Sequence, residues 1–262
     1  MKQLAPAADM TFFQGMKWVN DDDFIVDSLS FHSSMRDYVT QTTAERIHIL
    51  KNKAFLDYYD RLLAGRKVER MLEIGIWEGG SLLLFAHATD IPRISAIDIR
   101  NPSEAITRHL EAHNLQDRVH IHYGVSQGDK ASVLQALGKD HGDQLLDLVI
   151  DDASHKYDLT KAAFETAFPR LRPGGVYVIE DWNWAHFGEE VFDTGEWGAA
   201  PALSNLILEL CIAAGSPRGA SLIDRIEVNT YFAAIIRGHA PLGNDFRLDD
   251  AIQLGPRQFK KL

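Results

Sequence analysis

The stretch EIGIWEGGS, residues 73–81, decides the fold, because it joins the short apolar run RMLEIG to the helical pattern SLLLFAHAT. A strand, a glycine turn and a helix in this order begin a βαβ unit. Glycines at Gly75 and Gly79 permit positive φ and let a ligand approach the backbone, which a β-carbon would prevent. The stretch therefore predicts a ligand-binding turn at the carboxyl end of a strand.

The same alternation of short strands with amphipathic helices continues along the chain. The further strands that we predict are RISAIDI, RVHIHYG, LDLVIDD and GVYVIED, with later candidates RIEVNTY and YFAAIIRG. The helices between them are EAITRHLEAHN, KASVLQALGKDHG and LTKAAFETAFPRL. Parallel strands need helical crossovers, so this pattern predicts a Rossmann-like α/β fold, doubly wound around a mostly parallel sheet. Ligands of such sheets bind outside the carboxyl ends of the strands.

The residues before this alternation are expected to form a separate helical region. The run TTAERIHILKNKAFLDYYDRLLAG, residues 42–65, has apolar residues at helical spacing, with Thr43 as a candidate N-cap and Gly65 as a candidate stop. We therefore predict an N-terminal helical lid or substrate region over residues 1–65 and the α/β domain over residues 66–262.

Composition narrows the possible function classes. The 262 residues are 45% hydrophobic, and 27 basic against 37 acidic residues give a net charge of -10, so affinity for nucleic acid or an anionic membrane is not expected. Neither a signal-peptide pattern nor a run of about 20 apolar residues is present in the sequence. The single cysteine, Cys211, lies in an apolar helical run and reads as a core thiol, which favours the cytoplasm.

The glycine turn and two carboxylates, Glu73 and Asp98, together indicate a site for a nucleoside. Asp98 ends the second strand about 20 residues further on, where a carboxylate can accept hydrogen bonds from a ribose diol. The spacing is E-x-G-x-x-x-G instead of the dinucleotide pattern G-x-G-x-x-G, and Glu73 would repel a pyrophosphate. A nucleoside with a cationic end fits better.

Two acidic pairs end the next two strands. Asp151-Asp152 follow LDLVI, and Glu180-Asp181 follow GVYVI. Neighbouring strands lie about 4.8 Å apart, so the four carboxylates would converge, and like charges at such distances need a counter-charge. All-oxygen ligation favours Mg²⁺, with Ca²⁺ or Mn²⁺ as alternatives. The competing interpretation, in which the first pair caps the next helix and the second is a solvated turn, is weaker for two pairs on adjacent strands.

With these motifs the chain resembles the class I S-adenosylmethionine-dependent methyltransferases, over roughly residues 66–240. The segments IDDASH and LRPGGVYVIED are similar to those of the metal-dependent macrolide-sugar O-methyltransferases of the macrocin and mycinamicin type. The resemblance implies a seven-stranded sheet. It also implies that the second aspartate of the D-D-x-S-H motif and the following acidic pair hold the metal, and that the motif histidine is the base.

Carried over residue by residue, the resemblance implies three groups of site residues. Those of the cofactor are Glu73, Gly75, Gly79, Ser81, Asp98, Ser126, Gln127 and Asp151. Those of the metal are Asp152, Glu180 and Asp181, and those of catalysis are Asp152 and His155. Apart from the resemblance, His186 and His32 are backup candidates for the base. The cofactors implied are S-adenosyl-L-methionine and Mg²⁺ or another hard divalent cation.

The function expected is therefore methyl transfer from S-adenosylmethionine to a hydroxyl of a small molecule, such as a natural-product sugar, in antibiotic biosynthesis. A sugar hydroxyl is a poor nucleophile until a metal and a base act on it. The aromatic residues within 182–201 are candidates for acceptor stacking, or for packing alone. Cofactor binding without methyl transfer is the alternative, and a nicotinamide-dependent oxidoreductase is disfavoured by the glycine spacing. A homo-oligomer is left open.

Overall fold

The computed structural model describes residues 11–256, and these form two compact units. The N-terminal unit holds the described residues through Glu69, together with Ile76–Ile94 and Pro102–Val119. The sheet unit holds Arg70–Gly75, Ser95–Asn101 and the chain from His120 onward.

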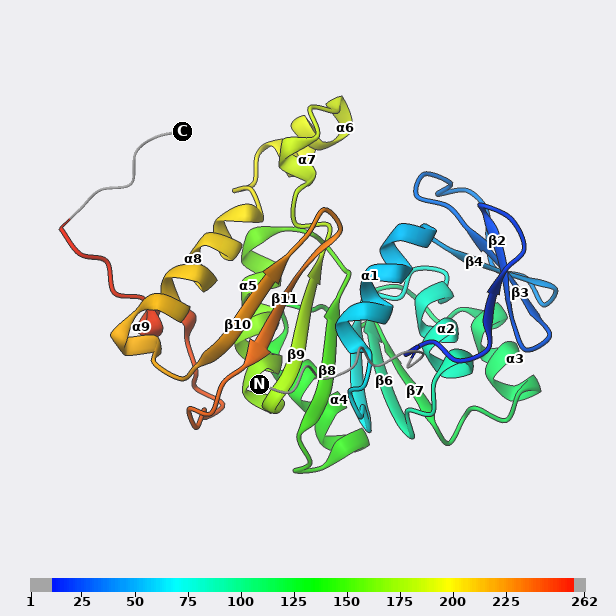
Figure 1. Ribbon diagram of the computed structural model, residues 1–262, viewed down its shortest axis with the longest axis horizontal. Coiled ribbons are helices and arrows are strands. Elements are labelled where there is room, and N and C mark those ends of the chain that lie inside the picture. Colours follow the sequence, from blue (N-terminus) through cyan, green and yellow to red (C-terminus); the bar gives the residue numbers. More distant parts are fainter. Residues whose placement is uncertain (1–10, 257–262) are drawn as a thin grey trace, which may run out of the picture. The chain divides into compact units, whose positions relative to one another are not determined.

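The sheet unit is built on a seven-stranded sheet in the order β10-β11-β9-β8-β5-β6-β7 (Figure 1). Its strands are β5 (Arg70–Ile74), β6 (Arg93–Asp98), β7 (Val119–Tyr123), β8 (Leu146–Asp151), β9 (Leu171–Glu180), β10 (Ile223–Val228) and β11 (Phe232–Arg237). Strand β8 pairs in parallel with both β5 and β9, and β11 pairs antiparallel with β9 and β10. The predicted α/β class with a mostly parallel seven-stranded sheet is confirmed.

Helices α4 (Lys130–His141), α5 (Tyr157–Ala167) and α8 (Ser204–Gly215) share one hydrophobic core with the central strands. Leu72, Val149, Phe164 and Tyr177 in this core are fully buried. All six residues of β8 are buried, and strands that are buried on both faces in this way are typical of parallel sheets. The shorter elements of this unit are η1 (Phe168–Arg170), η2 (Trp184–His186), α6 (Glu190–Asp193), α7 (Gly195–Gly198), η3 (Pro217–Gly219) and α9 (Leu248–Ala251).

The N-terminal unit contains a second, four-stranded sheet in the order β1-β2-β3-β4. Its strands are β1 (Met16–Trp18), β2 (Asp23–Val26), β3 (Leu29–Ser33) and β4 (Arg46–Ile49), with β3 and β4 parallel. The helices of this unit are α1 (Lys53–Leu63), α2 (Gly80–Ala88) and α3 (Glu104–Ala112).

Across both units, the strands and helices that the sequence pattern predicts from residue 70 onward are found at the predicted positions.

The predicted helical character of the N-terminal region is wrong for residues 11–52. The segment RIHI, expected to begin a helix, is strand β4, and its Ile47 and Ile49 are buried. Thr43 accepts from the backbone of Arg46 in a turn, and α1 is instead capped by Asn52, whose side chain accepts from the Phe55 amide. Apolar residues at Ile47 and Phe55 fit a helical period, but β-branched isoleucines alternate equally well in a strand.

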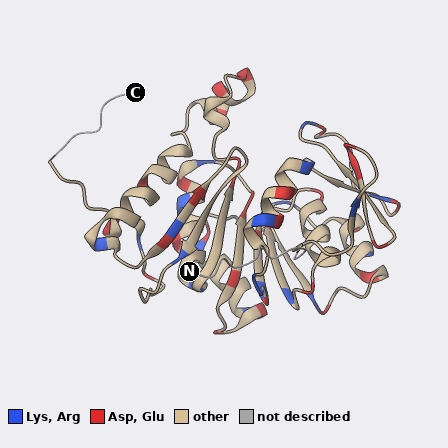
Figure 2. Cartoon of the chain, in the orientation of Figure 1, with Lys and Arg blue, Asp and Glu red and all other residues tan. Residues whose placement is uncertain are grey.

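Charged residues of both signs are interspersed along the elements (Figure 2). Within residues 11–256, the structure contains no helix with the length and apolarity required for a bilayer span. Cys211 is an exposed residue of α8, so the core-thiol interpretation is wrong.

Candidate active site

The two predicted acidic pairs lie side by side at the carboxyl edge of the sheet unit. Asp151 ends β8 and Glu180 ends β9, and the parallel register pairs Asp151 with Ile179. The loop after β8 is tied to β5, because the Asp152 amide donates to the Ile74 carbonyl at 2.9 Å. The ends of β8 and β9 therefore lie next to each other, as the strand order predicts.

Asp152, His155 and Asp181 each direct one ligand atom into a shared space. These three atoms lie within 4.8 Å of one another, and His155 Nε2 is 3.8 Å from Asp152 Oδ1. Glu180, predicted as a third carboxylate ligand, is 1% exposed at the strand end and is not part of this group of donor atoms. Two carboxylates this close match the oxygen ligands of a divalent-cation site, and the imidazole lies beside them, where it can accept a proton.

Two residues of this group adopt left-handed backbone conformations. His155 has φ 54° and Asp181 has φ 52°. Such conformations cost a residue with a β-carbon roughly 1–2 kcal/mol, and they concentrate at functional sites. The Asp181 amide donates to the Tyr231 carbonyl at 2.9 Å, which fixes the turn that carries its carboxylate. The strain is therefore held by the surrounding structure at the two loop positions that aim side chains into the site.

The competing interpretation, helix capping by the first acidic pair and a solvated turn for the second, does not describe Asp151, Asp152 or Glu180. Helix α5 begins after Lys156, and no side chain caps it, so Asp151 and Asp152 are not its caps. Glu180 is buried instead of standing in a solvated turn.

Asp151 is buried at the end of β8 and hydrogen-bonded by two neighbouring side chains. Its carboxylate accepts from the Tyr177 hydroxyl at 3.0 Å and from the Gln127 amide at 3.3 Å. Burial raises the pKa of Asp151 to about 8, and the nearby charge of Asp152 also raises it. Metal-free protein at neutral pH therefore holds this carboxyl largely protonated. Sequence reasoning missed Tyr177, although a single hydroxyl in the apolar run GVYVIED is a signal for a buried hydrogen bond.

The stability of the metal-free protein is expected to fall as pH rises from about 4 to about 8. In this window the folded protein keeps a proton on Asp151 that an unfolded aspartate, with a pKa of about 3.9, has released. The contribution of this group to the slope is at most about 1.4 kcal/mol per pH unit. Urea unfolding in EDTA at several pH values measures it. The variant Asp151→Asn, which is neutral throughout, should lack this fall, and parallel pH curves for the two proteins would contradict the assignment.

The predicted cofactor residues of the sheet unit surround the same strand ends. Gly75 has φ 83°, and a β-carbon there would lie 2.4 Å from the Asp152 carbonyl oxygen, so this glycine is required by the β8 loop itself. Asp98 is 6% exposed and accepts from the Arg100 amide at 2.8 Å. Glu73 is buried in β5, and Gln127 accepts from the Ser154 amide at 2.9 Å.

Two other predicted cofactor residues, Gly79 and Ser81, belong to the N-terminal unit. Gly79 is the N-cap of α2 with φ 80°, and a β-carbon there would meet the side chain of Ile106 at 2.7 Å. Ser81 is buried in the first turn of the same helix. Ser126, in the sheet unit, accepts from the Gly128 amide at 3.3 Å in the turn after β7.

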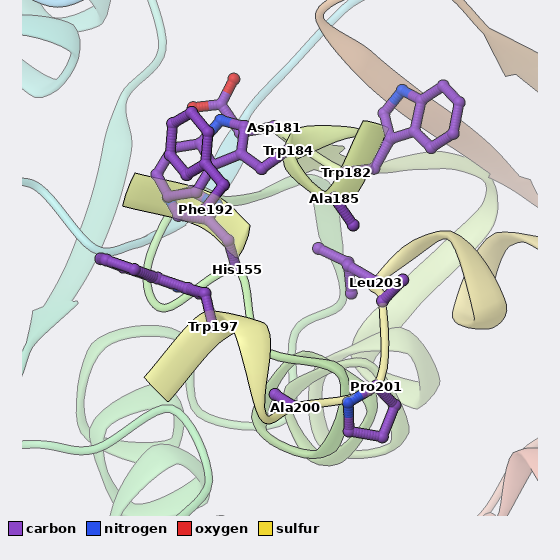
Figure 3. Close-up of a pocket in the computed structure, with 11 residues that line it drawn as sticks. His155, Asp181, Trp182, Trp184, Ala185, Phe192, Trp197, Ala200, Pro201 and Leu203 are labelled. Carbon is purple, nitrogen blue, oxygen red and sulfur yellow. The ribbon is translucent and has the colours of Figure 1, made fainter. Parts of the chain in front are cut away.

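The aromatic residues after β9 cluster around His155 (Figure 3). The Trp184 ring lies 4.1 Å from the His155 ring, and Phe192 and Trp197 pack on Trp184 at 4.6 and 5.7 Å. Trp182 points away, and its indole donates to the Asn229 carbonyl. A pocket of about 20 Å³ lies among these aromatic side chains and extends from His155 and Asp181 to Leu203. That volume suffices for about one water molecule, so a larger ligand requires the aromatic segment to move.

The two backup bases have other partners. His186 is exposed and lies 2.9 Å from the Ser204 hydroxyl. His32 belongs to the N-terminal unit, where its Nδ1 lies 2.9 Å from the Asp23 carboxylate. Within the described residues, His155 is the histidine that shares the group of donor atoms with Asp152 and Asp181.

The sequence is similar to those of known methyltransferases. Residues 72–182 match a family model described as a methyltransferase domain. The chain is 34% identical over 146 residues to demethylmacrocin O-methyltransferase of Streptomyces fradiae, which covers 51% of this chain and 34% of that protein. It is 33% identical over 148 residues to mycinamicin VI 2''-O-methyltransferase of Micromonospora griseorubida, covering 51% and 33%.

A solved structure shows the same relationship. MycE methyltransferase from the mycinamycin biosynthetic pathway, in complex with Mg, SAH and mycinamycin VI, superposes with a TM-score of 0.53 and 27% identity over 73% of this chain and 50% of that chain. The present chain thus spans about a third of the length of these curated relatives and half of that structure. Residues 72–182 therefore match a methyltransferase domain, the chain has the α/β fold of the class I methyltransferases, and it resembles the macrocin and mycinamicin O-methyltransferases.

Proposed function

We propose that the protein is an S-adenosylmethionine-dependent O-methyltransferase that requires a divalent cation and methylates a hydroxyl of a small molecule, namely a sugar of a natural product. The observation that carries the proposal is the meeting of Asp152, His155 and Asp181 donor atoms within 4.8 Å at the carboxyl edge of the sheet. The activities named for the related enzymes support the acceptor class.

The residues of the sheet unit divide into a cation side and a cofactor side. Asp152 and Asp181 would hold the cation, with Glu180 from the end of β9 as a further oxygen ligand. Asp151, Glu73 and Asp98 would face the cofactor, Asp98 accepting from the ribose hydroxyls. Ser126 and Gln127 would lie beside the adenine, and Gly79 and Ser81 stay predictions from the sequence. When bound, the cation lowers the pKa of a coordinated hydroxyl and the cofactor supplies an activated methyl group.

His155 is the proposed general base. Its ring packs against Trp184 at a tilt of 48°, which restricts its orientation, and its Nε2 lies 3.8 Å from Asp152 Oδ1. A hard cation such as Mg²⁺ prefers oxygen ligands, which leaves the imidazole free to accept the acceptor's hydroxyl proton. The aromatic wall of Trp184, Phe192 and Trp197 would exclude water from this proton transfer.

Replacement of His155 by glutamine is expected to lower kcat by about 100-fold or more, since a positioned base contributes at least that factor. The remaining rate should change less with pH than the wild-type rate, because glutamine cannot accept a proton. Steady-state kinetics across pH with saturating Mg²⁺ measure both effects. His186→Gln is the matched control and should keep wild-type kinetics; an equal loss in both variants, or an unchanged pH profile in His155→Gln, would contradict the role of His155.

The function itself is tested by product mass. The protein is incubated with S-adenosylmethionine, Mg²⁺ and a glycosylated macrolide with free sugar hydroxyls, with and without EDTA. The expected product gains one methyl group only when the cation is present. Methyl transfer that survives EDTA would contradict the metal requirement, and cofactor binding without any methylated product would favour the alternative of a binding module.

Location and partners stay predictions. The exposed free thiol of Cys211 is compatible with the reducing conditions of the cytoplasm, where we place the protein. The net charge of -10 supports a small-molecule partner in preference to nucleic acid or a membrane surface.

A further inference from the structure

Three histidines of the N-terminal unit meet where two helices end. His87 lies in the last turn of α2, His109 in the last turn of α3, and His113 is the C-cap of α3. One ring nitrogen of each lies within 4.8 Å of the other two. His87 Nε2 and His109 Nε2 are 2.9 Å apart, and the His87 ring stands at 87° to each of the other two rings. None of these residues belongs to the proposed methyl-transfer site.

We propose that His87, His109 and His113 bind one divalent transition-metal ion, Zn²⁺ in the first place, through three imidazole nitrogens. Three histidine ligands and an open fourth position are a common zinc arrangement. Tetrahedral Zn–N bonds of about 2.0–2.1 Å put neighbouring nitrogens about 3.3 Å apart. The observed 2.9 Å needs only a few tenths of an ångström of opening to reach that separation.

The positions of the three residues along the helices favour a bound cation. His109 and His113 are four residues apart, which places them on one face of α3, and the third ligand comes from a second helix. Both helices present their carboxyl ends to the cluster. The aligned peptide dipoles give a helix carboxyl end a partial negative charge, which stabilises a nearby cation.

The protonation of the cluster is also suited to metal binding. Burial, and then the neighbouring histidines, lower the pKa of His87 to about 4, and the same causes act on His109. Both rings are therefore neutral at pH 7, and neutral imidazole is the form that binds metals. The Arg118 guanidinium, which donates to the Ala86 and Thr89 carbonyls, contributes to this effect on His87 and lowers the cation affinity of the cluster.

The donor chemistry separates this cluster from the other groups that could attract a metal. The Asp152, His155 and Asp181 group offers two carboxylates and suits a hard ion, whereas three nitrogens suit Zn²⁺, Co²⁺ or Ni²⁺. A third group, His32, Asp37 and His48, contains one carboxylate, and the Arg46 guanidinium bonds to His32 Nδ1 at 2.8 Å. An experiment must therefore assign a bound ion by substitution and not by stoichiometry alone.

The test is metal binding to the full chain in excess Mg²⁺, which occupies oxygen sites. Co²⁺ is titrated while its visible absorption is followed, because tetrahedral nitrogen coordination gives distinct bands, and Zn²⁺ is measured after dialysis. The variant is His113→Ala, an exposed position whose replacement leaves the core intact, and the control is His239→Ala, also exposed. Wild type and the control should bind one ion more tightly than His113→Ala by at least about tenfold. Equal affinity and equal spectra in all three proteins would overturn the proposal.

Thermal unfolding provides a second measurement that does not depend on enzyme activity. At free Zn²⁺ of about 100 times its Kd, the wild-type Tm should rise by about 5 °C, because the ion joins the ends of α2 and α3 in the folded state only. His87→Gln keeps the side-chain size and should lose the rise, as should His113→Ala. A Zn²⁺-dependent rise of the same size in these variants, or none in the wild type, would also overturn the proposal.

Discussion

Replacing Asp152 by asparagine is expected to lower kcat for methyl transfer by about 1000-fold at saturating Mg²⁺. Asp152 lies in the group of donor atoms with His155 and Asp181, and its backbone amide is fixed by the Ile74 carbonyl. Asparagine keeps the size and the backbone bond but removes the negative charge. Losing about 4 kcal/mol of charge stabilisation at a cation site corresponds to roughly three powers of ten in rate.

The control for this variant is Asp158→Asn, an exposed carboxylate in the first turn of α5. Steady-state kinetics should give wild-type kcat for the control, and calorimetric titration should give similar affinity for S-adenosylmethionine in all three proteins. If Asp152→Asn keeps more than about a tenth of the wild-type kcat, its carboxylate is not a ligand of the catalytic cation. If both variants lose activity equally, the effect is one of general charge and not of the site.

Replacing Gly75 by alanine is expected to lower the free energy of unfolding by about 3 kcal/mol or more. The residue has φ 83°, and the added β-carbon would lie 2.4 Å from the Asp152 carbonyl oxygen and 2.7 Å from Ala153 Cα. The left-handed conformation alone costs alanine roughly 1–2 kcal/mol, and forced repacking of rigid backbone adds about 1–3 kcal/mol. The β8 loop must then shift, which also displaces the Asp152 carboxylate.

Gly124→Ala is the matched control, because Gly124 has φ 71° and no atom within 4 Å of the β-carbon position. Gly124→Ala should lower the free energy of unfolding only by the cost of the left-handed backbone conformation, roughly 1–2 kcal/mol. Urea unfolding followed by circular dichroism compares the two variants. Equal losses would show that the close approach of the β8 loop to Gly75 does not contribute to stability.

The strain at His155 and Asp181 connects these stability effects to the site. Both residues have positive φ, and both carry side chains of the donor group. Loops held in such conformations depend on the contacts around them. Here those contacts include the tie between Asp152 and Ile74 and the one between Asp181 and Tyr231. The sheet therefore stabilises the conformation that aims the donor atoms at one point.

Local pattern alone determined much of this protein. The seven strands of the large sheet and the helices α2, α3, α4 and α5 follow from apolar periodicity and glycine turns, because burial on a pleated sheet or on one helix face requires that periodicity, whereas the short helices α6 and α7 were not predicted. The pairing of Asp151-Asp152 with Glu180-Asp181 at one edge follows from the rule that parallel strands end together.

Only the tertiary structure decided the rest. The segment RIHI is compatible with both a helix and a strand, and its parallel pairing with β3 selects the strand. The grouping of His155 with Asp152 and Asp181, and the burial of Glu180, depend on two left-handed loop residues that no spacing predicts. Likewise, α2 and α3 bring His87 to His109 although 22 positions separate them. Sequence period fixes which face of an element is apolar, whereas the direction of a polar side chain depends on contacts between residues far apart in the chain.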